Sequence, residues 1–379
     1  MRRLLFSFVL LMSIVGTLWA QDDEKERKWQ LKGYLKDLVT VGFVGDSVLV
    51  DNLIHNRLNF KWYPVSSLNI YMELRTRAFH GDLVRTIPDY AELIDNNDDL
   101  LDLSAILIDN DGFILHTMLD RAYAEWIRNN WEIRIGRQRI NWGTNLIWNP
   151  NDVFNAYSFF DFDYEERPGS DAIRIKKYTG FASSVEVAAS FTKDFENSVV
   201  AGMWTFNRNN YDVKILTGKS YSDIILGTGW AGNIGKGGFK GEITWFKPYD
   251  KDVSYEALLA SVSLDYSFKN SLYLLGSVLY NSAGESEPPS DLFLIRSRTL
   301  TAKELSPYSW STFLQGSYQV HPLVLTGLAV ILYPTNGDLF VNPSVTVSLV
   351  KNLDLDLIGQ LFFGEIENYA LYGRLKWSF

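Results

Sequence analysis

Residues 369–379 close the chain with the run YALYGRLKWSF, in which apolar and polar side chains alternate. One side of such a strand would carry Tyr369, Leu371, Gly373, Leu375, Trp377 and Phe379. The other side would carry Tyr372, Arg374 and Lys376. Because successive side chains of a β-strand point to opposite faces, the run predicts a strand with one apolar and one charged face. Such a strand suits a barrel wall with lipid outside and water inside.

The same alternation recurs from Gln30 onward in segments of about ten residues. We therefore predict an all-β fold, a transmembrane antiparallel up-and-down β-barrel of about 18 strands. The strands are expected near residues 31–43, 51–63, 67–79, 117–128, 131–142, 170–178, 182–192, 196–207, 209–218, 221–231, 237–247, 253–268, 271–282, 309–321, 323–333, 338–350, 353–364 and 367–379. About 16 strands is the alternative, because the segments around 196–232 alternate poorly.

The connections between these segments divide by length. If the N-terminus starts in the periplasm, every even-numbered connection is a periplasmic turn and should be short. Asn129-Asn130, Lys269-Asn270 and Lys351-Asn352 are such turns, rich in residues that favour tight turns. The long connections, at about 80–116, 143–169 and 283–308, all fall on odd positions. This parity supports the register and predicts that the long loops are extracellular.

The N-terminus and the composition agree with export. A basic pair, Arg2-Arg3, precedes an apolar run from Leu4 to Leu18 and a small residue, Ala20, so residues 1–20 are predicted to be a signal peptide and 21–379 the barrel domain. The chain has 12 Trp, 20 Tyr and 23 Phe, as aromatic girdles require. The net charge of −9 argues against nucleic acid as a partner. The predicted location is the outer membrane of a Gram-negative bacterium.

Alternation also assigns side chains to the lumen. The residues expected there are Arg57, Lys61, Glu73, Arg75, Arg77, Arg121, Glu125, Arg134, Arg174 and Lys176, followed, beyond a bulge expected at Gly136, by Arg137 and Arg139. Five consecutive strands thus present many cations and few anions. A basic wall in a narrow, low-dielectric channel would attract anionic solutes. The alternative is that a polar interior simply needs charge for solvation and register.

The loop at 143–169 is expected to fold into the lumen, because a loop so rich in aromatic residues should not remain in water. It would carry the carboxylates of Asp152, Asp161, Asp163, Glu165 and Glu166 toward the wall arginines. Acid and base facing each other across a constriction would orient charged solutes. The alternative is that these carboxylates form salt bridges that only hold the loop in place.

Four short stretches carry a resemblance to known proteins: 120–123 (DRAY), 135–143 (IGRQRINWG), 148–152 (WNPND) and 166–171 (ERPGSD). They resemble the central segment of porin-like families, including the alginate-export and phosphate-selective porins. The resemblance implies a solute-conducting barrel with an inward loop and an arginine-lined constriction, without a particular substrate. The last strand, which ends at Phe379, resembles the terminal insertion signal of bacterial outer-membrane proteins and implies recognition by the barrel-assembly machinery.

The sequence therefore predicts a porin-like channel for passive diffusion of small hydrophilic, anionic solutes. Outer-membrane lipid and lipopolysaccharide would surround it, and no cofactor or metal is expected. The first alternative is a surface glycan-binding or attachment barrel with a plugged lumen. An outer-membrane hydrolase is a weaker alternative, because no serine motif accompanies the four histidines. We expect no enzyme.

Overall fold

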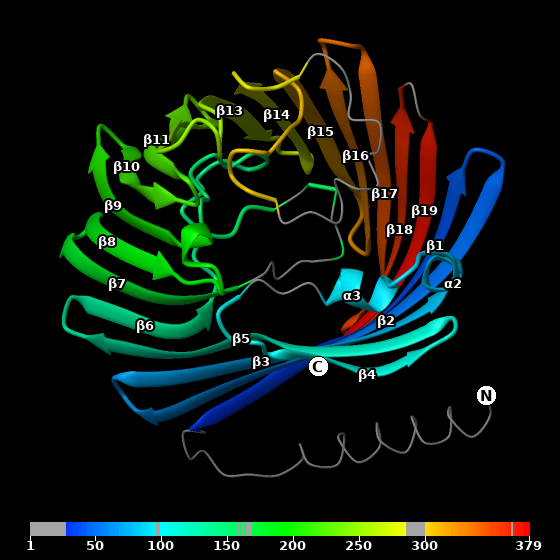
Figure 1. The fold of residues 1–379 in the computed structure, drawn as a ribbon. Coiled ribbons are helices and arrows are strands. Elements are labelled where there is room, and N and C mark those ends of the chain that lie inside the picture. Colours follow the sequence, from blue (N-terminus) through cyan, green and yellow to red (C-terminus); the bar gives the residue numbers. More distant parts are fainter. Residues whose placement is uncertain are drawn as a thin grey trace.

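The computed structural model describes residues 28–95, 99–157, 159–160, 163, 169–285, 300–364 and 367–379, so the predicted signal peptide lies outside the described residues. These residues form a closed antiparallel barrel of 18 strands with one extra strand, β4 (Figure 1). The strands are β1 Trp29–Val44, β2 Ser47–Val65, β3 Leu68–Gly81, β4 Ser104–Asn110, β5 Phe113–Arg128, β6 Trp131–Gln138, β7 Ser170–Gly180, β8 Ser183–Ser190, β9 Val199–Arg208, β10 Tyr211–Ser220, β11 Asp223–Ile234, β12 Gly237–Pro248, β13 Ala257–Ser267, β14 Leu272–Asn281, β15 Trp310–His321, β16 Val324–Tyr333, β17 Asp338–Val350, β18 Leu353–Phe363 and β19 Asn368–Ser378. Short helices are α2 Asp82–Thr86, α3 Tyr90–Ile94 and the 3₁₀ turn η1 Phe195–Asn197. Within the described part of the chain, no helix is long and apolar enough to cross a membrane.

The ring closes where β1 pairs with β19 on one side and with β2 on the other. Each remaining barrel strand pairs with its sequence neighbours, except that β5 takes the place after β3. The prediction of 18 barrel strands is confirmed, and the alternative of 16 is not. Closure removes free edges from the wall, as a membrane barrel requires.

At one end of the barrel the strands are joined by short turns, and the three long loops all lie at the other end. Asn129, Asn209, Asn210 and Asn352 take positive φ angles between 53° and 65° in these turns, a conformation that asparagine tolerates. The three long connections leave β3, β6 and β14 at the opposite end. The parity predicted from the sequence is therefore confirmed.

The wall is taller on one side. β1, β2, β3 and β5 have 16, 19, 14 and 16 residues, whereas β6 and β8 have 8 each. β4 pairs with the long-loop half of β5, and β6 with the other half. The strand β4 was not predicted from the sequence, since residues 104–110 fall within the segment 80–116 that was assigned to a loop.

A β-bulge lies at Asp120. Glu73 pairs with Arg121 and Leu74 with Leu119, so Asp120 is the extra residue and both Asp120 and Arg121 reach the lumen. The bulge predicted at Gly136 is wrong, because pairing of β6 with β5 and β7 continues through it. Gly136 instead has φ of 116°, and the chain leaves the sheet after Gln138.

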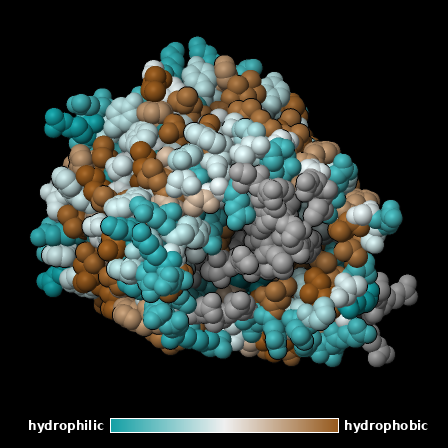
Figure 2. Space-filling view, turned by 45° about the horizontal axis from the view of Figure 1, so that its top comes forward, coloured by the Kyte–Doolittle hydropathy of each residue, from teal (hydrophilic) through white to brown (hydrophobic). Residues whose placement is uncertain are grey.

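The outer face of the wall is apolar. Exposed side chains such as Leu264, Leu314 and Leu371 alternate along the strands with buried or polar inward ones. Hydrophobic residues recur along the flank of the barrel that Figure 2 shows, with hydrophilic residues between and around them. The barrel therefore presents to its surroundings the surface expected of a wall in lipid.

Candidate functional site: the lumen wall and the inward loop

The chain between β6 and β7 enters the barrel, as the sequence predicts (Figure 1). One part packs Trp142, Val153 and Phe154 against the inner faces of β7 to β13. A second part stacks Phe159 and Phe160 edge-on against Phe313 and Phe340, with ring centroids 4.9 Å apart in each pair. The aromatic residues thus bury themselves inside the barrel. The loop covers the inner wall from β7 to β18.

Glu242 on β12 holds the beginning of this loop. Its fully buried carboxylate accepts hydrogen bonds from the backbone N–H groups of Thr144, Asn145 and Asn151. From β10, Lys214 donates through Nζ to the carbonyl oxygens of Trp142 and Gly143, at 3.1 and 3.2 Å. One carboxylate and one ammonium group therefore satisfy five backbone groups of a segment whose described residues form no helix or strand.

The sequence reading missed Glu242. The available signal was a carboxylate at an inward position of a predicted strand, in the middle of the chain. Its partners are backbone N–H groups, which carry no residue-type signature, so only the structure shows its role.

Asp163 ties the far part of the loop to the opposite wall. Its carboxylate lies 2.8 Å from Lys36 Nζ, 3.4 Å from Arg374 Nη1 and 3.7 Å from His55 Nδ1. Burial alone would raise the pKa of Asp163, but His55 and Lys36 lower it more strongly, so the pKa lies below its usual range. Asp163 therefore meets basic side chains, as expected, although none of them is among the residues predicted to line the lumen.

Because the pKa of Asp163 is lower than the value of about 3.9 for a free side chain, its ion pairs should stabilise the loop at every pH above about 3.9. This contribution is lost only as the pH falls further, toward the folded-state value. We expect the noise of single-channel currents to stay constant from pH 7 to about 5, and Asp163→Asn to increase it at pH 7. Noise that changes in the wild type between pH 7 and about 5 would instead indicate that a group other than Asp163 controls the loop.

The other predicted loop carboxylates have different fates. Asp152 is fully buried and accepts a hydrogen bond from the backbone N–H of Trp142 at 3.3 Å, so it serves the fold of the loop. Asp161, Glu165 and Glu166 lie outside the described residues.

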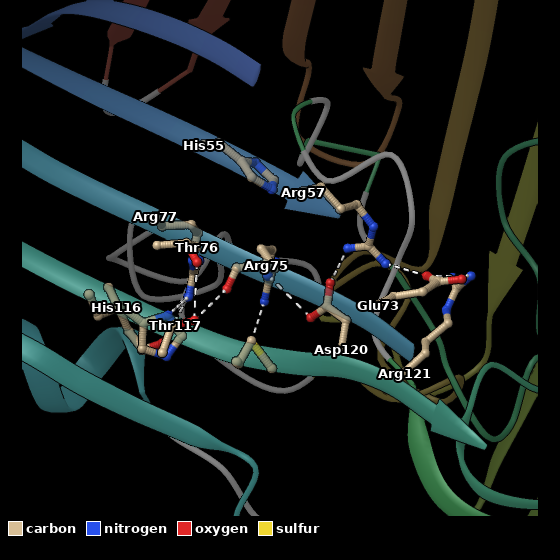
Figure 3. A network of polar contacts seen from close by, with 12 residues as sticks. His55, Arg57, Glu73, Arg75, Thr76, Arg77, His116, Thr117, Asp120 and Arg121 are labelled. Atoms are coloured by element: carbon tan, nitrogen blue, oxygen red, sulfur yellow. Dashed lines mark hydrogen bonds and ion pairs between the residues drawn. The ribbon is translucent and has the colours of Figure 1, made fainter. Parts of the chain in front are cut away.

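A buried ion network crosses β2, β3 and β5 (Figure 3). Arg57 is fully buried and binds the carboxylates of both Asp120 and Glu73. Arg75 Nε lies 3.2 Å from the other oxygen of Asp120, and Arg121 reaches Glu73 at 3.3 Å. Two residues that the sequence singled out as cations, Arg57 and Arg75, thus serve as partners of buried carboxylates.

A second group of charged side chains, on β5 to β8, is more exposed than this network. Side-chain exposure is 19% for Arg121, 26% for Arg134 and 22% for Lys176. Their partner carboxylates are less exposed, at 11% for Glu73, 5% for Glu125 and 3% for Glu186. Arg174 follows the same pattern between Glu132 and Glu186. In these pairs the cation is more exposed than the carboxylate with which it pairs.

The remaining predicted lining residues are spread more widely. Arg137 is buried and binds Asp171 and Asp99, away from the lumen water. Arg77 donates to the carbonyl oxygen of Ile94 at 3.2 Å and contacts His116 at 3.1 Å, next to α3. Lys61 lies over the ring of Tyr71, and Arg139 is half-buried just beyond β6.

The expectation of few anions on this wall is wrong. Glu132 and Glu186, together with the bulge residue Asp120, bring a carboxylate next to most of the cations. Asp120 and Glu186 were not assigned to this wall because the alternation of a single strand does not show which residues of its neighbours lie beside them.

The fold has clear relatives among solved structures. OccAB4 of Acinetobacter baumannii superposes with a TM-score of 0.60 at 8% identity, over 94% of this chain and 100% of that one. OccK5 (OpdH) of Pseudomonas aeruginosa gives 0.60 at 9% identity, over 93% and 98%. OpdK of the same organism, solved with vanillate, gives 0.59 at 8% identity over 93% and 98%. No known protein-family profile and no curated protein matches the chain.

These neighbours are outer-membrane porins of the Occ/OprD group. The fold of this chain is therefore that of a Gram-negative outer-membrane β-barrel, in agreement with the predicted location. At 8–9% identity the comparison shows the fold alone. The resemblance to alginate-export and phosphate-selective porins is not confirmed.

Proposed function

We propose that this barrel is a passive channel for small hydrophilic solutes that carry negative charge. The observation that carries the proposal is the order of exposure among the charges on β5 to β8, where the cations are more exposed than the carboxylates that pair with them. The porin fold of the structural neighbours supports a channel, and one neighbour was solved with vanillate. Lipopolysaccharide outside and the barrel-assembly machinery during insertion remain proposed partners.

A simple magnitude shows why this order matters. At an effective dielectric constant of about 20, a solute anion about 4 Å from a guanidinium group is attracted by about 4 kcal/mol. A carboxylate about 7–8 Å away repels the same anion by only about 2 kcal/mol. The wall is therefore attractive to anions although its ion pairs are nearly balanced in number. Low-dielectric walls strengthen this attraction.

The inward loop supports a narrow route along the charged wall. It packs on the inner faces of β7 to β18, whereas the partly exposed cations lie on β5, β6 and the part of β7 around Lys176. A solute that crosses the barrel should therefore pass beside Arg121, Arg134 and Lys176. Close passage makes selectivity depend on these few side chains.

Two adjacent lysines on β7 provide a matched test. Lys176 faces the lumen beside Glu186, whereas Lys177 lies over the ring of Trp131, which faces outward. We expect Lys176→Gln to lower the anion-to-cation permeability ratio about two- to fivefold, corresponding to about 0.5–1 kcal/mol. Lys177→Gln should leave the ratio unchanged. The ratio is obtained from reversal potentials in a salt gradient, with vanillate as a further test anion.

Equal effects of the two substitutions would show that the lumen-facing cations on β5 to β7 do not set the anion preference. A folded wild-type barrel that never conducts would contradict a channel altogether and would favour the surface-binding alternative.

A further inference from the structure

The outer wall of β13 to β16 contains two glycines among leucines. Gly276 on β14 and Gly316 on β15 lie at outward positions of their strands. Each glycine pairs in register with a leucine on both neighbouring strands, and these four leucines are 43% to 59% exposed: Leu264 and Leu314 beside Gly276, and Leu274 and Leu328 beside Gly316. A glycine between two outward leucines leaves a hollow in the wall.

The two hollows join into one groove of about 560 Å³ on the outer surface, and its lining is almost wholly apolar. A Cβ added at Gly276 would lie 3.6 Å from Leu314 Cδ2. A Cβ added at Gly316 would lie 3.4 Å from Leu274 Cδ2, so both glycines leave room for a side chain. The groove is therefore an open space among apolar side chains, and its volume is within the range of about 300–1,000 Å³ that is typical of ligand sites.

Between the groove and the short-turn end of the barrel the surface changes character. Phe268 and Tyr318 both lie level with Leu272, two residues beyond Leu274, and they are 43% and 40% exposed. Aromatic side chains at such a level mark the interface of a membrane barrel. Lys269, in the turn that joins β13 to β14, is exposed next to them. From the groove to the turn the surface is therefore apolar, then aromatic, then positively charged.

A phospholipid has the same order along its length: an apolar acyl chain, an ester region and a charged headgroup. On a flat wall an acyl chain contacts protein on one side only, whereas in a groove it also contacts protein on its flanks, and each added atom pair contributes dispersion energy. The positive charge of Lys269 attracts an anionic headgroup. Because the short-turn end is predicted to be periplasmic, such a lipid would belong to the periplasmic leaflet.

We propose that the groove of Gly276 and Gly316 binds one phospholipid of the periplasmic leaflet, with an acyl chain in the groove and an anionic headgroup beside Lys269. The groove is continuous with the apolar outer wall, so an acyl chain reaches it without leaving the membrane. The basic turn lies at the end of the groove where the headgroups of that leaflet lie. The proposal rests on the outer-membrane fold and not on solute selectivity.

Native mass spectrometry of the full-length protein, extracted from outer membranes into mild detergent, tests the groove. The wild type should retain one phospholipid. Gly276→Leu should lower the lipid-bound fraction at least about tenfold, because its side chain takes the place of several buried methylene groups of the lipid. Gly316→Leu fills the other part of the groove and should act in the same way. Gly373→Leu is the matched control and should retain lipid as the wild type does, since Gly373 lies between the exposed Val39 and Leu357 on the outer wall but does not line the groove.

Lipid added back to delipidated protein tests the headgroup. The wild type should prefer phosphatidylglycerol to phosphatidylcholine, and Lys269→Gln, in an exposed turn, should reduce this preference about two- to fivefold. An unchanged preference would overturn the assignment of the headgroup to Lys269. Equal lipid retention by the wild type and both groove variants, a wild type that retains no phospholipid, or retention of lipopolysaccharide alone would overturn the proposal. Conductance of the same samples reports separately on the channel.

Discussion

Replacing Glu242 with alanine is expected to raise the single-channel conductance about twofold or more. The substitution leaves the N–H groups of Thr144, Asn145 and Asn151 without their acceptor. A hydrogen bond to a charged group contributes about 1.5–3 kcal/mol, so losing all three strongly weakens the attachment of the beginning of the loop to the wall. The beginning of the inward loop should leave the wall and widen the passage.

Two further variants make this test specific. Glu242→Gln keeps the shape and one acceptor oxygen, so its conductance should fall between those of the wild type and the alanine variant. Glu256→Ala removes an exposed carboxylate that accepts only a surface hydrogen bond from Trp245, and it should change nothing. A folded Glu242→Ala barrel with wild-type conductance would show that the loop does not limit the pore.

Replacing Asp120 with asparagine is expected to reduce the stability of the barrel by about 3–5 kcal/mol. Asp120 is buried and pairs with both Arg57 and Arg75, so its loss leaves two buried guanidinium groups without this partner. The effect is large because a buried charge without its counter-ion costs more than the pair contributes. Urea-induced unfolding from lipid vesicles measures it.

Asp46→Asn is the matched control, since Asp46 is exposed in the turn between β1 and β2. It should alter the free energy of unfolding by less than about 0.5 kcal/mol. If Asp120→Asn is equally mild, water must reach the network of Figure 3, and the ion pairs there are not a buried unit.

Much of the fold follows from the sequence because the alternation of a membrane strand is local. The strand that ends at Phe379 shows it directly: Leu371 and Leu375 are exposed outside, while Arg374 binds Asp356 inside. The turn signals at Asn129 and Asn352 are local too. Strand number, parity and inward or outward orientation could therefore be predicted before any contact was known.

The charge partners could not be predicted in the same way. Arg57, Glu73 and Asp120 come from three strands, and their meeting depends on the register and on the bulge at Asp120. A bulge shifts the alternation by one residue, and in the sequence alone such a shift cannot be told from an irregular pattern. For this reason the sequence overstates the positive charge of the wall. It also does not show that the cations are more exposed than the carboxylates with which they pair.

Single-channel recording of the refolded protein in planar bilayers, with reversal potentials under a salt gradient, shows whether the lumen conducts and whether it prefers anions. We predict stable conductance with a reversal potential on the anion-selective side, which Lys176→Gln moves toward zero while Lys177→Gln does not. A folded barrel that stays silent, or one that prefers cations, would show that this protein is not an anion-preferring channel.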